Sequence, residues 1–500
     1  MTTTCDILIT GGRLIDPQHS TDEITTIAIS QGRIASLGEQ SLEADRVIDA
    51  SGKIIAPGFI DVHSHAQNIP GHRLQAFDGV TTTFEMEAGA SPVASALEWA
   101  ASEGRPLNYG FSAGWLHTRA RVLENYDDDA LAALPDLPLD SMGVISAQGS
   151  LWNAPATAEQ REEIIRLLEE QLDAGAIGIG VLLGYAAEAE PAELMAVAEL
   201  GARRNMPLFV HTRIGPMLPG KTPLEGIEEL LEASLATGAH IHMCHFNSSA
   251  SSHPREAREK ILAAQAEGVR FTTELYPYGF SSTVIGAGFL DPEILEAAGR
   301  PPGIITPVAT GQPAESYAEI ARLRQEDPSQ LCLIRYYQDP WDGADLAEVM
   351  SLPGALFASD AMPLKPLQGQ GEVDIMQWPL PEGVSAHPRS TACFTRALAW
   401  LHRDRGLLEL SDVIARSTVM PAQLLRGAIP AMERKGHLGL GADADLVIFD
   451  LEALQPNTSI SPVEASRGVE HLLVGGTPVI SDGELLTGAL PGGAVLPSNP

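Results

Sequence analysis

The sequence predicts an α/β protein in which a small β-rich domain, built from both ends of the chain, flanks a larger β/α domain. Residues 1–56 and 431–500 consist of short strand-like segments separated by glycine-containing turns, such as DILITGGRLID and GADADLVIFDLEAL. These two ends together predict one β-sandwich domain. Residues 57–430 instead alternate strand-like and helix-like stretches. Repeated β–α units in one long domain are typical of a (β/α)₈ barrel or of a doubly wound parallel sheet.

The central stretch carries the local signals of both kinds of element. The strand candidates are the apolar runs GFIDVHSH, GVTTTFEME, LNYGFSAG, GAIGIGVLL, LFVHTR, HIHMCHF, RFTTELYPY, CLIRYY and ALFASDAMP. A helical pattern such as TAEQREEIIRLLEEQLDAG begins at a good N-cap, Thr157, and stops at Gly175. No glycine-rich phosphate motif follows the first strand, which disfavours a dinucleotide-binding sheet. Residues 280–345 exceed the length of one crossover, so we expect a lid there.

Composition restricts the class of protein and its partners. The chain has 500 residues, 44% of them hydrophobic, which is enough for one large domain and an accessory domain. A net charge of −33 repels nucleic acid and anionic membranes, so we expect neither as a partner; it is also compatible with a salt-adapted host. No signal peptide and no membrane-spanning run is visible, and the four scattered cysteines are typical of reduced thiols. We therefore expect a cytoplasmic protein.

Ionisable residues occur where the predicted central strands end. His63 and His65 are two positions apart, so in an extended segment both side chains point to one face and can bind one cation. His211 follows the run of Leu, Phe and Val in LFVHTR, and Asp360 follows the apolar run in ALFASDAMP. In HIHMCHF the period of two leaves open which histidines point inward. In a barrel the strand ends share one mouth, and imidazoles with a carboxylate favour zinc or a similar divalent ion.

Seven segments, in order along nearly the whole chain, resemble one family. They are PGFIDVHSH, VHTR, HMCHFNSS, YPY, ASDAMP, HPRSTACFTR and GLGADADLVIFD. As a set they are similar to the amidohydrolase superfamily, and within it to the D-aminoacylase (N-acyl-D-amino-acid deacylase) branch. The resemblance implies a (β/α)₈ barrel with a small β-sandwich, and hydrolysis of an amide by metal-activated water. The implied metal ligands are His63, His65, His211, His245 and Asp360. His240 and His242 are then structural.

Two strands depart from the pattern of that family. The fourth strand, GAIGIGVLLGYA, contains no lysine or glutamate that could bridge two ions. The cysteine that D-aminoacylases carry after the second strand is replaced by Ala88 in FEMEAG. Glu85 and Glu87 share one side of this strand, and we predict that Glu87, nearer the strand end, bridges the metal ions. The alternative is a single-metal site in which Glu87 binds substrate or is solvated.

The resemblance also implies substrate contacts. Arg389 in HPR matches an arginine that holds the substrate α-carboxylate, a role suited to the guanidinium fork. The other implied substrate contacts are Tyr185, Tyr278, Ser282, Arg119 and Asn247, the last in place of a lysine of the family. If Arg119 and Arg335 face the pocket, an acidic substrate such as an N-acyl-D-glutamate would suit them.

These features predict a hydrolase that uses one or two Zn²⁺ ions to cleave the amide of a small N-acyl amino acid, of the D series. Asp360 is the expected catalytic residue, taking a proton from metal-bound water and passing it to the leaving amine. A cyclic-amide hydrolase of the hydantoinase or dihydroorotase type is one alternative, which the missing strand-four lysine and Arg389 disfavour. A non-catalytic barrel scaffold is the other, which the complete ligand set disfavours. The oligomeric state is open, and a homo-oligomer is compatible with the sequence.

Overall fold

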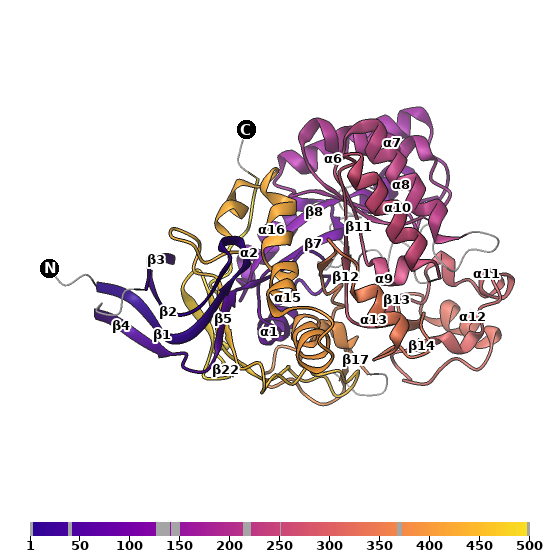
Figure 1. Cartoon of the computed structure of the whole chain (residues 1–500). Coiled ribbons are helices and arrows are strands. Elements are labelled where there is room, and N and C mark those ends of the chain that lie inside the picture. The colour runs from indigo at the N-terminus through magenta and orange to yellow at the C-terminus, as the bar shows by residue number, and fades with distance from the viewer. Residues whose placement is uncertain are drawn as a thin grey trace.

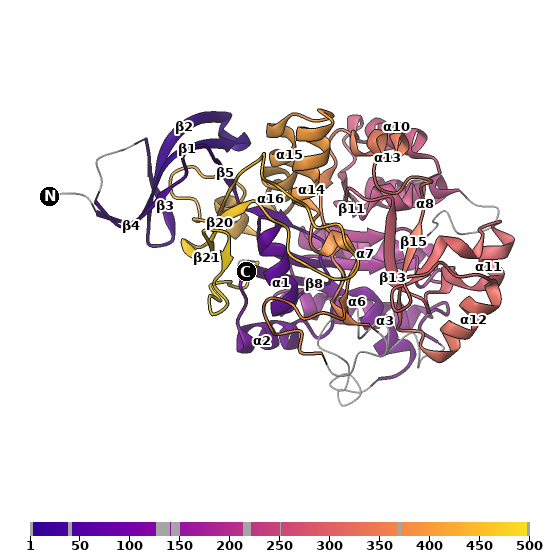
Figure 2. The same ribbon diagram turned by 90° about the horizontal axis from the view of Figure 1, so that it is seen from below.

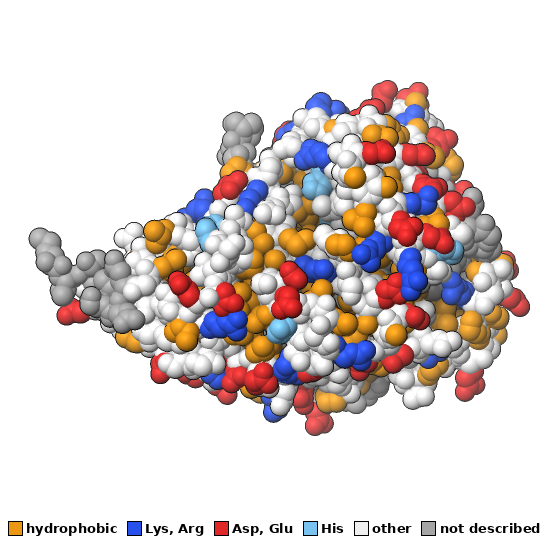
Figure 3. All heavy atoms as spheres, viewed as in Figure 1, with side chains coloured by type: hydrophobic (Ala, Val, Ile, Leu, Met, Phe, Trp, Pro, Cys, Tyr) orange, Lys and Arg blue, Asp and Glu red, His pale blue; other side chains and the backbone are white. Residues whose placement is uncertain are grey.

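The computed structural model describes residues 4–38, 43–126, 141, 151–213, 222–250, 252–367 and 373–497. Figure 1 shows a sheet near the N-terminus beside a larger body in which helices surround a set of strands. No described helix has the length and apolar character needed to cross a membrane. On the face in Figure 3, acidic and basic side chains are interspersed.

The larger body is a barrel of eight parallel strands. In chain order they are β6 (Phe59–Asp61), β7 (Val80–Ala90), β8 (Asn108–Gly114), β9 (Ile179–Leu182), β10 (Leu208–His211), β11 (Ile241–Met243), β12 (Phe271–Leu275) and β16 (Leu356–Phe357). Each strand pairs with the next, and the residues that follow β16 return to those that follow β6. Ser64 bridges to Ala361 there, and the backbone N–H of Asp360 donates to the carbonyl of His63 at 2.7 Å. This closure confirms the barrel and excludes the doubly wound sheet.

Helices cover the outside of the barrel. They are α1 (Ile69–Phe77), α2 (Val93–Glu103), α3 (Trp115–Leu123), α6 (Ala158–Asp173), α7 (Pro191–Arg204), α8 (Pro223–Thr237), α10 (Pro254–Ala266), α13 (Ala344–Met350), α14 (Phe394–Arg396), α15 (Leu410–Ser417) and α16 (Val419–Arg426), with a π-helix at Ala397–Asp404. The short helix α9 (Phe246–Ser249) instead lies at the mouth of the barrel, directly after β11. Helix α6 begins where the sequence predicts, because Thr157 and Gln160 form a reciprocal capping box.

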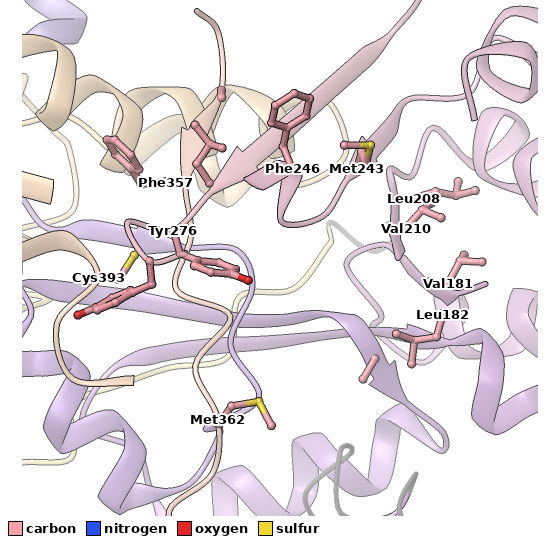
Figure 4. Packing of buried hydrophobic residues seen from close by; sticks show 14 of the residues in the cluster. Val181, Leu182, Leu208, Val210, Met243, Phe246, Tyr276, Phe357, Met362 and Cys393 are labelled. Atoms are coloured by element: carbon pink, nitrogen blue, oxygen red, sulfur yellow. The ribbon is translucent and has the colours of Figure 1, made fainter. Parts of the chain in front are cut away.

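The strands bury one face against these helices. Figure 4 shows Val181 and Leu182 of β9 beside Leu208 and Val210 of β10, in the cluster that also contains residues of the surrounding helices. The intervening residue Phe209 belongs to a second cluster, as alternation along a strand requires. The next residue on the face of Phe209 is His211, at the strand end, which is why a polar side chain lies at the barrel mouth.

Both ends of the chain contribute to one nine-stranded sheet, which agrees with the predicted accessory domain. Its strands are β1 (Thr4–Asp16), β2 (Thr21–Ser30), β3 (Arg33–Leu37), β4 (Glu43–Asp49), β5 (Ile54–Pro57), β19 (Leu446–Phe449), β20 (Val469–Val474), β21 (Thr477–Ser481) and β22 (Glu484–Leu485). The two ends join where β5 and β19 pair antiparallel. Beyond the last strand of this sheet, Gly492 and Ala494 form isolated β-bridges with Arg105 and Tyr109, near the start of β8. The exact domain limits stay a prediction.

The segment expected to form a lid folds into a small sheet with helices. Strands β13 (Phe280–Val284), β14 (Ile305–Pro307) and β15 (Leu331–Arg335) form the sheet, and α11 (Pro292–Ala297) and α12 (Tyr317–Glu326) flank it. Figure 2 places these elements at the end of the molecule far from the N-terminus. A separate hairpin-like pair joins β17 (Lys365–Pro366) to β18 (Val384–Ser385).

Candidate metal centre

Six side chains with metal-binding atoms converge where the barrel strands end. They form two groups whose ligand atoms lie within 4.8 Å of one another: His63, His65 and Asp360 in one, and Glu87, His211 and His245 in the other. They come from the ends of β6, β7, β10, β11 and β16. All are buried except His211, which is partly exposed. The donor set of imidazoles and carboxylates fits divalent ions such as zinc.

Glu87 lies between the two histidine pairs. Its Oε1 atom is 2.8 Å from Nε2 of His245 and 3.1 Å from Nδ1 of His211. Its Oε2 atom is 3.3 Å from Nε2 of His63 and 3.6 Å from Nε2 of His65. One oxygen therefore faces each pair, which is the geometry of a carboxylate able to bridge two ions. Ala88, at the position of the family's cysteine, contributes no donor atom.

Two further carboxylates contact the Nδ1 atoms of His63 and His65. Nδ1 of His65 is 2.7 Å from Oε2 of Glu85, and Nδ1 of His63 contacts Oε1 of Glu274 on β12. These contacts leave the Nε2 atoms of both rings facing the centre, and such carboxylate–histidine pairs orient metal ligands in many sites. Glu274 also contacts Nε2 of His242 at 3.0 Å, which gives that histidine the structural role expected for it.

The sequence analysis missed Glu274. The signal was present, because RFTTELYPY places a single carboxylate in an otherwise uncharged run after its first residue, and a fully buried glutamate is rare without a partner.

Mutual electrostatics keep the carboxylates of the centre charged. Burial raises the pKa of Glu87, but His63 and His245 outweigh it and hold that pKa well below its usual range. Burial likewise raises the pKa of Asp360, and the Arg389 guanidinium and His63 lower it to a net value below the ordinary one. Burial lowers the pKa of His63, and Glu274 and Glu87 then raise it well above its usual value. The centre thus contains negatively charged carboxylates, and a bound cation would neutralise their charge.

Two of these residues adopt backbone conformations that side chains with a Cβ rarely take. His245 has φ 36° and Asp360 has φ 50°, both in the left-handed region. The turn at His245 explains why the period of two could not assign the histidines of HIHMCHF. Cys244 and His242 share one face of the strand, and His245 reaches the centre only because its backbone departs from the extended conformation. Its Nδ1 atom is then fixed by Ser249 Oγ at 3.0 Å.

The centre opens into a pocket, and residues of the segment expected to form a lid contribute to its wall. The pocket is lined by His65, Glu87, Gly184, Tyr185, His211, Thr212, Arg213, His245, Ser248, Ser249, Ser281, Ser282, Thr283, Phe289, Ile334, Tyr336, Asp360 and Met362. Two of the expected substrate residues are among them. Tyr185 bonds Thr283 Oγ1 through its hydroxyl at 2.5 Å, and Ser282 Oγ is buried with no partner among the described residues.

The other expected substrate residues lie behind the pocket wall. Tyr278 donates its hydroxyl to the carbonyl of Ala392 at 2.8 Å, and Asn247 donates its amide to the carbonyl of Tyr278 at 2.9 Å. Arg389 is fully buried, and its Nη2 atom is 2.8 Å from Oδ1 of Asp360. Its Nη1 atom has no partner among the described residues. In this structure Arg389 holds Asp360, and a direct contact with a substrate carboxylate stays a prediction.

Arg119 requires a correction. It lies on α3, fully buried, where it forms an ion pair with Glu193 of α7 and donates to the backbone carbonyls of Trp152 and Ala154. It is absent from the pocket lining, because a buried guanidinium needs a complete set of acceptors and finds them between these segments. Arg335, at the end of β15, is exposed and is also outside the lining. Neither arginine therefore faces the pocket, which was the condition for expecting an acidic substrate.

Comparison with known proteins agrees with this geometry. The pattern of the amidohydrolase family matches residues 46–292. An N-acyl-D-glutamate deacylase of Alcaligenes xylosoxydans xylosoxydans is 28% identical over 499 residues, which cover 95% of this chain and 93% of that protein. Residues 46–292 therefore contain an amidohydrolase domain.

Two further proteins extend the comparison. A D-aminoacylase of Alcaligenes xylosoxydans xylosoxydans is 26% identical over 504 residues, covering 95% of this chain and 94% of that one. The crystal structure of an N-acyl-D-glutamate deacylase from Bordetella bronchiseptica, complexed with zinc and a phosphonate inhibitor, is similar with a TM-score of 0.74. The two chains are 24% identical, and the match covers 99% of this chain and 100% of that structure. This last likeness confirms the fold of a barrel with a small sandwich domain.

Proposed function

We propose that this amidohydrolase is a zinc-dependent deacylase that hydrolyses the amide bond of N-acyl-D-amino acids. The observation that carries the proposal is the position of Glu87, whose two oxygens face two separate histidine pairs at the floor of a pocket. The names of its two relatives, N-acyl-D-glutamate deacylase and D-aminoacylase, support the substrate class. We also propose that it acts in the cytoplasm, where its four free, buried cysteines stay reduced.

In this proposal the two donor groups would hold two divalent ions. His63, His65 and Asp360 would hold one, His211 and His245 would hold the other, and Glu87 would be available to both. When bound, such ions act as Lewis acids and lower the pKa of a water ligand to about 7. The protein's part is to fix the donors: Glu85 and Glu274 orient the first histidine pair, and Ser249 orients His245.

Asp360 moves the proton. Its neighbours keep the carboxylate charged, so it can accept a proton from the attacking water and deliver it to the nitrogen of the leaving amine. Arg389 fixes Oδ1 of Asp360 at 2.8 Å, which restricts the carboxylate to one orientation above His63 and His65. The hydroxyl of Ser282, buried in the wall and without a partner in the described part of the chain, is suited to bind a polar group of the substrate.

The lining favours a substrate with a neutral side chain. Phe289, Ile334, Tyr336 and Met362 supply apolar surface on the lid side and the far wall. Among the described lining residues the one Lys or Arg is Arg213, and its Nη2 atom is already 3.0 Å from Oε1 of Glu229. A second carboxylate on the substrate would therefore find no unpaired cation in this part of the pocket, and its burial would cost free energy.

The test is hydrolysis of a matched panel by the zinc-loaded protein. N-acetyl derivatives of D- and L-leucine, D-phenylalanine, D-glutamate and D-aspartate would be compared with hydantoin and dihydroorotate by following the released amine or ring opening. We expect N-acetyl-D-leucine to exceed its L enantiomer and N-acetyl-D-glutamate by about tenfold or more in kcat/KM. Asp360→Asn, loaded with zinc in the same way, is the control for contaminating activity. Faster turnover of a cyclic amide, or no amine release from any acyl-D-amino acid, would overturn the proposal.

A further inference from the structure

Cys244 lies against the metal centre, and the proposed function gives it no role. It follows β11 directly, is fully buried, and precedes His245 in the chain. Its Sγ atom, a ring nitrogen of His63 and a carboxylate oxygen of Glu87 all lie within 4.8 Å of one another. Three donor atoms at this spacing, none of them exposed, form a ligand group of their own.

The thiol approaches the centre from the core side. Cys244 belongs to the apolar cluster that contains Phe84, Met86 and Phe209, and it is absent from the pocket lining. His63 is likewise fully buried and outside the lining, whereas Glu87 reaches the pocket. The cysteine would therefore approach an ion beside His63 from the core, on the side away from the pocket.

Other uses of this thiol fit the structure poorly. A nucleophilic cysteine must reach substrate, and Cys244 has no exposed surface. It forms no disulfide, since all four cysteines are free. A cysteine that only filled the core would have no reason to share a site with an imidazole nitrogen and a charged carboxylate, because apolar side chains pack there at lower cost.

We propose that Cys244 is a sulfur ligand of the ion held by His63 and His65, an inference that rests on the proposed function because it assigns a further donor to the same centre. Binding exchanges the S–H bond for a sulfur–metal bond, and the thiol proton is released to water. With Glu87 and Asp360, the thiolate gives the centre a third anionic donor. Sulfur ligation makes the site selective for softer divalent ions such as zinc, cobalt and cadmium over magnesium and calcium.

Cobalt substitution tests the ligand directly, without reference to turnover. The metal-free protein would be loaded with Co²⁺, and the near-ultraviolet spectrum recorded for thiolate-to-cobalt charge transfer, alongside the weaker visible bands that report bound cobalt. Cys244→Ser and Cys244→Ala remove the sulfur. Cys393→Ser is the matched control, because Cys393 is equally buried, donates its thiol to the carbonyl of Ala358 at 3.4 Å and belongs to no ligand group of the described residues.

We expect the charge-transfer band in the wild type and in Cys393→Ser, and its loss in both Cys244 variants together with cobalt binding weakened about tenfold or more. Visible cobalt bands without charge transfer in the wild type would overturn the sulfur ligand and leave the proposed function standing. A band that persists in either Cys244 variant would overturn it as well. Failure of the wild type to bind cobalt or zinc at all would instead overturn the proposed function, so the two failures are distinguishable. The wild-type spectrum decides even if one Cys244 variant does not fold.

Discussion

Replacing Glu87 with alanine should weaken the binding of both metal ions. Among the described residues it is the one side chain that contacts both histidine pairs, at 2.8 and 3.1 Å on one side and 3.3 and 3.6 Å on the other. A four-ligand zinc site is worth about 10–16 kcal/mol, so one ligand contributes about 3 kcal/mol. Because about 1.4 kcal/mol is a tenfold change in Kd, Glu87→Ala should raise the Kd of each zinc ion about 100-fold.

The matched comparison is Glu85→Gln, two residues earlier on the same strand. Glu85 contacts His65 at Nδ1 and accepts the backbone N–H of Ala88 at 3.0 Å, but it contacts neither His211 nor His245. Glutamine retains an acceptor there, so we expect a loss of about tenfold that is confined to the ion held by His63 and His65. The two variants therefore differ in how many ions they affect as well as in size.

Competition with a chromophoric zinc chelator measures both constants, and zinc per chain after dialysis at fixed free zinc measures the stoichiometry. Glu87→Ala should fall below one zinc per chain at a concentration that saturates the wild type. Two zinc ions bound with wild-type affinity in Glu87→Ala would refute the bridging role. So would an equal loss in Glu85→Gln, because it would show that the general negative charge of the centre, and not a shared ligand, determines affinity.

Three further predictions follow from contacts of single residues. Asp360→Asn should keep most of its zinc while kcat falls by about 10²–10⁴, as loss of general acid–base catalysis requires; a rate above about a tenth of the wild type would contradict its proton role. Arg389→Met should lower kcat about 100-fold toward N-acyl-D-amino acids and their methyl esters alike, because the guanidinium holds Asp360 at 2.8 Å; a loss confined to the free acids would show that it binds the substrate carboxylate. Asp78→Ala should lower the free energy of unfolding in urea by at least about 3 kcal/mol, because Asp78 accepts three buried backbone N–H groups of residues 393–395 at 2.7 to 2.9 Å. The control is Asp49→Ala at an exposed position, and similar urea midpoints for the two variants would contradict this reasoning.

The parts of the structure that follow from local patterns could be predicted from the sequence. Alternating apolar residues and glycine turns indicate strands, and a capping pair such as Thr157 and Gln160 indicates a helix start, because each signal lies within a few residues. The same is true of His63 and His65, whose shared direction depends only on the period of a strand. Glu87 was predicted from its place near a strand end, and the structure puts it in contact with both histidine pairs.

The parts that depend on distant partners could not be predicted in this way. Arg119 follows the third strand at a position that resembles a substrate contact, but its partner Glu193 lies 74 residues away on another helix. Glu274 orients His63 across 211 residues, and no local pattern connects them. His245 reaches the centre through a left-handed backbone conformation that a histidine in the sequence does not predict. Each depends on the closed barrel, which brings segments together only after folding.

The pairing of β5 with β19 gives the chain an order of assembly. Strand β5 precedes the whole barrel and β19 follows it, yet Ile55 lies opposite Ile448 in the sheet. During synthesis the first five strands leave the ribosome while the partner of β5 has still to be made, so one edge of that sheet stays open throughout production of the barrel. Open strand edges recruit other chains. If the ribosome paused before β19, the chain would carry a complete barrel sequence and a sheet whose β5 edge is still unpaired. Binding of chaperones to the nascent chain should therefore be greatest in that interval.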